Sequence, residues 1–287
     1  MRSRSLTTSH QHGFTLVELI MVIVIMGVVG GMVSVFMKGP IDAYISGGRR
    51  AALTDTADTT VRRMARDLHR ALPNSLRPCP AGVKGLEFIP TKTGGRYRAE
   101  GAGALIFSTP VSSFNMLGDY ANFAGTAIPA DQKIAADDLI VVYNLGITGA
   151  DAYAGNNLAT VSSLGTVALN NETPININQA TFSLASASNR FQVVPAAEKM
   201  VSYVCDANTR TLYRAANTTL TTTASCLITE APKIATNVDC GNTSFSISDS
   251  GNALNRNALV SMRLTLQDSS TTESVTLQHE VHVDNTP

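Results

Sequence analysis

The chain has 287 residues, of which 44% are hydrophobic and only 15% are charged, and it contains no Trp. A chain of this length can hold one large or two small domains, and the low charge favours an exposed, β-rich secreted protein over a cytosolic enzyme. The 22 basic and 22 acidic residues balance, so composition does not point to nucleic acid or an anionic surface as a partner.

The N-terminal region begins with a short basic segment and continues into a long apolar one. The first 13 residues include two arginines and no acidic residue. From Leu19 to Phe36 there are 18 residues whose only polar side chain is Ser34, enough to cross the apolar core of a bilayer, ~30 Å thick, as a helix. The basic side precedes this span, which predicts a cytoplasmic N-terminus and an exported remainder.

Glu18 distinguishes this segment from two simpler membrane signals. A secretory signal peptide would have a shorter apolar core and a small-residue cleavage site, whereas this chain runs on into Lys38 and Gly39. A plain single-span anchor does not explain a carboxylate at the start of the span, because an unpaired charge in a membrane is costly. Glu18 is therefore predicted to have a function.

The residues around Glu18 form a short motif, Gly13-Phe14-Thr15-Leu16-Val17-Glu18. It resembles the prepilin signature of type IV pilins, in which the leader ends in Gly and the mature chain has Phe first and Glu fifth. The resemblance implies that a membrane prepilin peptidase cuts between Gly13 and Phe14, and that the new amino group of Phe14 is N-methylated. It also implies that Glu18 pairs with the N-terminal amine of a neighbouring subunit, which would set the stagger between helices.

Glycine and proline residues occur within the apolar segment and just after it. Gly27 and Gly31 form a G-x-x-x-G pattern that allows close helix approach, although glycine is also simply tolerated in membrane helices. Gly39 and Pro40 are expected to kink or locally open the helix, because Pro40 lacks an N–H and clashes with the preceding turn.

Beyond Pro40 the pattern becomes that of an amphipathic helix. Apolar residues recur at helical spacing and Pro73 ends the run; they are Val61, Met64, Ala65, Leu68 and Leu72. One helix from Phe14 to Leu72 is therefore expected. The opposite face carries Arg62, Arg66 and Arg70 with acidic residues between them, a pattern typical of a solvated face, so nucleic acid is not expected as a partner.

From Pro73 onward the sequence predicts a β-rich head. Short β-type runs alternate with turn residues at 86–89, 104–108, 138–145, 180–184, 190–194, 200–205, 211–214, 243–247, 259–267 and 274–283. The predicted fold class is α+β, with a long N-terminal helix packed on an antiparallel-sheet head of one or two lobes. The predicted divisions are a leader (1–13), a transmembrane and polymerisation helix (14–38), its amphipathic continuation (39–72) and the head (73–287).

The four cysteines, Cys79, Cys205, Cys226 and Cys240, all lie in the head. An even number in an exported region favours two disulfides, with four free thiols as the alternative. Three pairings are possible. The residues between Cys205 and Cys226 indicate a hairpin, which favours Cys205–Cys226 and leaves Cys79–Cys240.

The sequence contains none of the common catalytic or nucleotide-binding motifs, so no enzymatic activity and no cofactor are expected. His279 and His282 lie three apart on a predicted strand and would face opposite sides, so they do not predict a metal site. Asp137 and Asp138 could contribute to a calcium site, but adjacent acids at the start of a strand are more typical of a turn.

Later segments sharpen the resemblance. Residues 26–77, Tyr203–Asp206 with Leu212–Arg214, and the C-terminal residues 279–287 resemble the O-type minor pilins of mannose-sensitive haemagglutinin (MSHA) pili, and more distantly the J-type minor pseudopilins of type II secretion. The mature chain would have 287 − 13 = 274 residues, more than a typical major pilin.

This resemblance implies a low-copy subunit that primes assembly or lies near the fibre tip. Its partners would be the prepilin peptidase, other minor and major pilins through the N-terminal helix, and the inner membrane of a Gram-negative bacterium before export to the extracellular fibre. The alternatives are a type II secretion pseudopilin and a tip adhesin that binds a surface ligand.

Overall fold

A computed structural model of the chain describes residues 13–123, 125–168, 170–229, 231–248 and 257–286. Apart from Gly13, the predicted leader lies outside the described residues. The chain divides into two compact units, residues 1–51 and residues 52–287, and each is described by itself.

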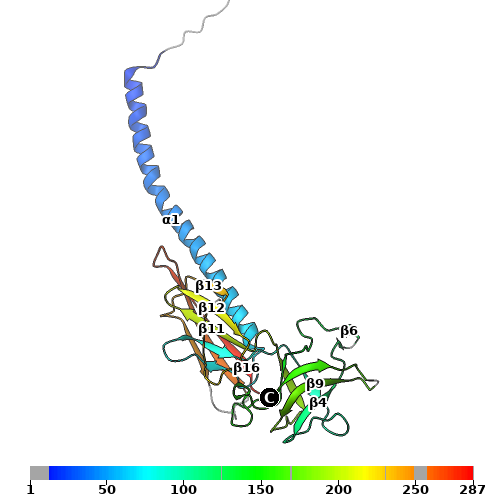
Figure 1. Ribbon diagram of the computed structural model, residues 1–287. Coiled ribbons are helices and arrows are strands. Elements are labelled where there is room, and N and C mark those ends of the chain that lie inside the picture. The colour runs from blue at the N-terminus through cyan, green and yellow to red at the C-terminus, as the bar shows by residue number, and fades with distance from the viewer. Residues whose placement is uncertain (1–12, 124, 169, 230, 249–256, 287) are drawn as a thin grey trace, which may run out of the picture. The chain divides into compact units, whose positions relative to one another are not determined.

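Helix α1 runs unbroken from Leu16 to Leu68 (Figure 1). Helix α1 ends at Leu68 and not at the predicted Leu72, because the chain changes direction there and pairs with the sheet region. The N–H of Arg70 donates to the carbonyl of Asp67 in a tight turn, and the carbonyl of Arg70 then accepts the N–H of Thr91 at 2.7 Å. Sheet pairing therefore replaces the last predicted helical turn.

Pro40 lies inside α1, and the helical backbone continues on both sides of it. The helix is therefore not opened at Gly39 and Pro40, and the expected kink there stays a prediction. Proline removes one backbone N–H and crowds the preceding turn, but a long helix can absorb this where its surface is open. The built Cβ position of Gly39 has no neighbour within 4 Å, so the helix surface is open at that point.

The described part of the chain after α1 consists almost entirely of strands and loops. The strands are β1 (Arg77–Pro78), β2 (Lys84–Phe88), β3 (Thr93–Tyr97), β4 (Pro110–Leu117), β5 (Asn122–Phe123), β6 (Thr126–Ala127), β7 (Leu139–Val141), β8 (Leu158–Leu164), β9 (Glu172–Thr181), β10 (Arg190–Val194), β11 (Met200–Asp206), β12 (Thr211–Asn217), β13 (Lys233–Thr236), β14 (Ser244–Ser248), β15 (Asn257–Gln267) and β16 (Ser274–Asp284). A short 3-10 helix, η1, covers Ala152–Ala154. All strand pairs are antiparallel, which confirms the predicted α+β class.

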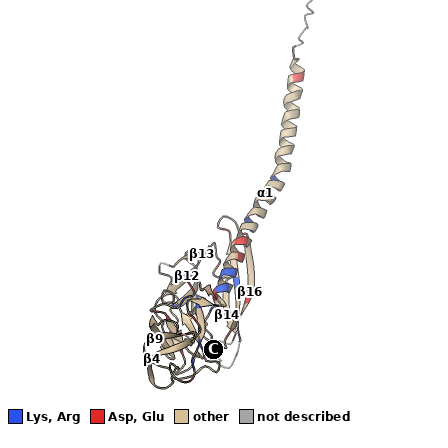
Figure 2. Ribbon diagram, turned by 90° about the vertical axis from the view of Figure 1, so that its right-hand side faces the viewer, with Lys and Arg blue, Asp and Glu red and all other residues tan. Residues whose placement is uncertain are grey.

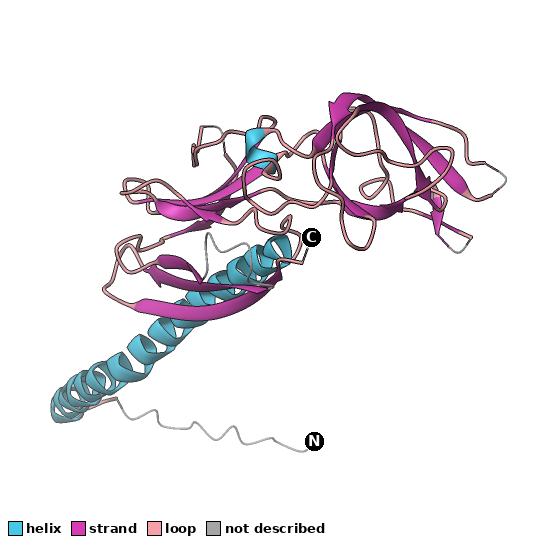
Figure 3. Cartoon of the chain, turned by 90° about the horizontal axis from the view of Figure 1, so that it is seen from below, coloured by secondary structure: helices cyan, strands magenta, loops and turns pink. Residues whose placement is uncertain are grey.

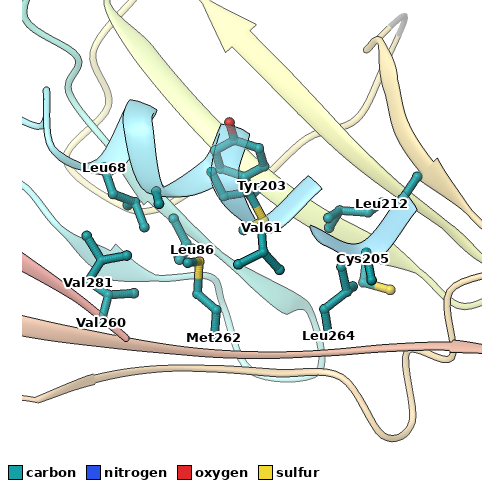
Figure 4. Close-up of a cluster of buried hydrophobic side chains, with 14 of the residues drawn as sticks. Val61, Leu68, Leu86, Tyr203, Cys205, Leu212, Val260, Met262, Leu264 and Val281 are labelled. Atoms are coloured by element: carbon teal, nitrogen blue, oxygen red, sulfur yellow. The ribbon is translucent and has the colours of Figure 1, made fainter. Parts of the chain in front are cut away.

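The last turns of α1 form one core with two sheets. One sheet has the order β1-β2-β11-β12-β13 and the other the order β14-β15-β16. The buried face of α1 repeats at helical spacing through Leu53, Ala57, Thr60, Val61, Met64, Ala65 and Leu68. In Figure 4, Val61 lies among Tyr203 of the first sheet and Met262 of the second. Full burial of one such side chain stabilises the fold by about 1.5–3 kcal/mol.

Six further strands close into a barrel, β10-β3-β4-β9-β8-β7, which is seen end-on in Figure 3, and β5 and β6 form a separate two-stranded sheet. Aromatic rings fill its interior, and Phe114 meets Phe191 edge-on with 5.6 Å between ring centroids. Gly95 on β3 makes room for this filling, because a Cβ there would lie 2.8 Å from the ring of Phe191. A strand with two glycines is weak by propensity, but here it fits a small, crowded barrel.

The barrel was not predicted. The expected strand at 104–108 is absent from this described segment, and the expected strand at 180–184 proves to be only the end of β9. The hairpins formed by β11 with β12 and by β15 with β16 are confirmed, and their register is continuous over seven and eleven residue pairs respectively.

Candidate assembly site

The predicted cleavage and pairing residues lie at the start of α1. Gly13 precedes the helix, and the side chain of Phe14 is 85% exposed. Thr15 caps the helix: its hydroxyl oxygen accepts the N–H of Glu18 at 3.3 Å, and its carbonyl accepts the N–H of Leu19 at 3.2 Å. This is the usual arrangement of an N-cap residue and the third residue of a helix.

The Glu18 side chain is exposed, and within the described residues no hydrogen bond or ion pair engages its carboxylate. The structure therefore presents this acid one turn after Phe14, without a counter-charge among the described residues. An acid near a helix N-terminus is favoured by the helix dipole, which is the simplest local reason for its position.

The helix that follows Glu18 is apolar on all sides. From Leu19 to Met37 the large apolar side chains are exposed around the whole circumference, including Ile20, Val24, Met26, Val29 and Phe36. By length and composition this part of α1 can cross a membrane. A surface of this kind in water is unfavourable, so it requires lipid or other helices around it.

Gly27 and Gly31 lie on this exposed surface. A Cβ built at either position meets no atom within 4 Å. Neither glycine is therefore required for packing within the unit that contains it. Their closeness to another helix stays a prediction from the G-x-x-x-G pattern.

The C-terminal end of α1 is fixed to the head by a charged network that the sequence analysis missed. The Asp67 carboxylate accepts from the Arg214 Nε and from the Tyr203 hydroxyl, each at 2.7 Å. Arg214 also donates to both carboxylate oxygens of Glu198, at 2.8 and 2.9 Å. Hydrogen bonding from Arg214 lowers the pKa of Glu198, while burial and the Asp67 charge raise the pKa of Tyr203.

The network around Asp67 joins one helix turn to two strands far away in the sequence. The separations are 136 residues from Asp67 to Tyr203 and 147 residues to Arg214. Helical spacing places Asp67 among the solvated charges, so nothing in the local pattern distinguishes it. In contrast, the ion pair of Asp58 with Arg62, at 2.7 Å, is exposed, as expected for charges on the solvated face of the helix.

The disulfides differ from the favoured pairing. Cys79 pairs with Cys226 and Cys205 pairs with Cys240, with Cα atoms 5.8 and 5.7 Å apart. The hairpin of β11 and β12 ends at Asn217, before Cys226 is reached. The segment after it returns towards β2, where the N–H of Cys226 donates to the Glu87 carboxylate at 3.3 Å.

A buried ion pair holds this returning segment in place. Arg77 donates to Glu87 at 2.8 Å from Nε, and it also donates to the carbonyls of Thr221 and Thr222 at 2.8 and 2.9 Å. The Glu87 side chain is fully buried, and the hydroxyl of Ser202 donates to it at 2.8 Å. A buried carboxylate needs such partners, so this cluster is structural.

The residues considered for metal binding do not converge. Within the described residues, no group of three or more His, Cys, Asp or Glu could hold a metal ion. Asp138 is buried in an ion pair with Lys92 at 2.5 Å and accepts the N–H groups of Ala135 and Ala196. Its position beside Asp137 therefore has a structural explanation.

One comparison with known proteins gave a match. Residues 8–34 match the family model described as the prokaryotic N-terminal methylation motif. No curated protein and no solved structure matched the chain. The matched motif is the substrate site of the prepilin peptidase, and it covers Gly13, Phe14 and Glu18 together with most of the apolar segment. The chain is therefore type IV pilin-like, with an N-terminal segment built for peptidase processing and membrane anchoring.

Proposed function

We propose that this chain is a minor type IV pilin of the MSHA kind, a low-copy subunit that primes pilus assembly or lies near the fibre tip. The observation that carries the proposal is the arrangement at the start of α1. A cleavage motif at Gly13 and Phe14 precedes an unpaired carboxylate, Glu18, on a helix whose apolar surface has no partner within its own described unit.

The proposed sequence of events follows from these groups. The chain is held in the inner membrane by α1 with its head in the periplasm, and prepilin peptidase cuts the bond between Gly13 and Phe14. The new amino group of Phe14 is methylated and stays cationic. Glu18 then pairs with the amine of a neighbouring subunit, since an apolar environment strongly favours pairing over two isolated charges.

The head supports a terminal position. It contains a barrel and two sheets joined to the end of α1, and two disulfides cross-link the sheet region. A bulky, cross-linked head is easier to accommodate at a fibre end, where one side is open, than at every repeat of a shaft.

The first experiment measures processing and the assembly phenotype in the native host. Mass spectrometry of the membrane-extracted chain should find Phe14 at the N-terminus with one added methyl group. Deletion of the gene should reduce the number of surface pili and leave exoprotein secretion intact. An unprocessed N-terminus would contradict the pilin assignment, and blocked secretion with normal pili would support a type II secretion pseudopilin instead.

A further inference from the structure

Two arginines lie directly opposite each other on the outer surface of the barrel. Arg96 on β3 pairs in register with Arg190 on β10. The N–H of Tyr97 donates to the carbonyl of Asn189 at 2.8 Å, so the arginine pair next to it is of the non-hydrogen-bonded kind. In that kind of pair the two side chains stand closest together.

Both arginine side chains are exposed, and among the described residues neither guanidinium group has a hydrogen bond or an ion pair. Like charges directly opposite each other destabilise a sheet. The neighbouring cations behave differently: Arg98 pairs with Glu172, and Lys92 pairs with Asp138. The cations that flank β3 are therefore neutralised, whereas Arg96 and Arg190 have no counter-charge among the described residues.

The arginine pair borders a groove of about 440 Å³ on the outer face of β3 and β10. Gly94, which faces Gln192 across the two strands, contributes no side chain to it, so the floor of the groove stays open. The two guanidinium groups at the edge of this open groove have no counter-charge among the described residues, which indicates a place for an anion.

We propose that this groove binds a sulfate or carboxylate group of an acidic polysaccharide. Paired guanidinium groups present several N–H donors to the oxygens of such an anion, and the anion would remove the repulsion between Arg96 and Arg190. The stretch around Gly94, which carries no side chain, leaves room beside the two guanidinium groups for the adjoining sugar. The inference does not depend on incorporation of the chain into a fibre.

The test uses the full-length chain in a non-ionic detergent, with immobilised polymers as probes. Biolayer interferometry at constant ionic strength would measure binding to dextran sulfate, alginate, uncharged dextran and poly-L-glutamate. We expect binding to dextran sulfate, alginate or both, and none to dextran. Dextran sulfate and alginate separate sulfate from carboxylate recognition, and poly-L-glutamate separates a polysaccharide from an acidic polypeptide.

Three double variants assign the binding to the groove. R96Q/R190Q should weaken binding about tenfold or more, as the loss of charged hydrogen bonds predicts. R96K/R190K keeps the charge but lacks the planar guanidinium groups. Its binding affinity should lie between those of R96Q/R190Q and the wild type. K233Q/R263Q removes two exposed cations from other sheets and should change binding by less than about twofold.

Equal weakening in R96Q/R190Q and K233Q/R263Q would overturn the proposal, because it would show a response to overall charge. So would tighter binding to poly-L-glutamate than to both polysaccharides, or no binding of the wild type to either one. Thermal unfolding of R96K/R190K and K233Q/R263Q should match the wild type, since all four positions are exposed, and R96Q/R190Q should be at least as stable because it removes the repulsion.

Discussion

The hydroxyl of Tyr203 on β11 donates a hydrogen bond of 2.7 Å to the carboxylate of Asp67 on α1. Arg214 on β12 donates to the same carboxylate oxygen, also at 2.7 Å. One helix side chain therefore fixes α1 to two neighbouring strands. This contact is the polar counterpart of the apolar face that α1 buries against the same sheet.

Asp67→Ala should lower the free energy of unfolding of the head by about 2–3 kcal/mol, because Tyr203 and Arg214 both lose a charged partner. Asp55→Ala is the matched control, since Asp55 is an exposed acid on the same helix, and it should change stability by less than about 0.5 kcal/mol. Urea unfolding followed by circular dichroism measures both values. Equal effects would mean that the network contributes nothing beyond surface charge.

The core between α1 and the two sheets predicts a second effect. Leu68→Ala removes a fully buried side chain, and it should destabilise the head by about 2–5 kcal/mol through lost burial and a residual cavity. Leu227→Ala changes a leucine that is 62% exposed and should cost less than about 0.5 kcal/mol. A small loss for Leu68→Ala would place the end of α1 outside the core.

The disulfide connectivity is open to direct mapping. Proteolysis of the non-reduced protein followed by mass spectrometry should recover linked peptides for Cys79–Cys226 and Cys205–Cys240. Detection of a Cys205–Cys226 peptide under conditions that block thiol exchange would contradict the structure.

The two disulfides should also differ in their contribution to stability. They close segments with sequence separations of 147 and 35 residues. Chain entropy alone then gives about 5 kcal/mol for Cys79–Cys226 and about 4 kcal/mol for Cys205–Cys240, as upper values. Double Cys→Ser variants measured by urea unfolding should show the larger loss for Cys79 and Cys226. The reverse order would mean that native-state effects outweigh chain entropy.

Glu172 gives the head a defined response to acid. A hydrogen bond from Asn115 and the charge of Arg98 hold the pKa of the Glu172 carboxyl below its usual value. The ionised carboxyl therefore contributes fully to the free energy of unfolding above the ordinary glutamate pKa of about 4.3. This contribution is lost as the pH falls through the lower pKa of the folded state. The stability difference between the wild type and Glu172→Gln should shrink between pH 6 and pH 3, and a constant difference would contradict this assignment.

Local patterns predict a large part of this fold. The spacing of Val61, Met64 and Leu68 predicts the buried helix face, and alternation predicts the hairpins of β11 with β12 and β15 with β16. These elements are regular and pair with their neighbours in sequence, so a short stretch of sequence contains the whole pattern that predicts each of them.

The features that were missed depend on distant residues. The barrel needs β3, whose two glycines make it weak by propensity, and Gly95 makes sense only beside Phe191. The disulfides depend on where the segment after β12 crosses the sheet, and the role of Asp67 depends on Tyr203 and Arg214. No local pattern encodes such contacts, because burial and pairing over long separations decide them.

The central claim concerns Glu18, and incorporation into fibres tests it most directly. Glu18→Ala and the control Glu280→Ala, which changes an exposed acid on β16, would be expressed in a deletion strain. Membrane and sheared-fibre fractions would then be quantified by mass spectrometry. We predict that Glu18→Ala is inserted and cleaved normally but is absent from the fibres, while Glu280→Ala is incorporated normally. Incorporation of Glu18→Ala at the wild-type level would contradict the account.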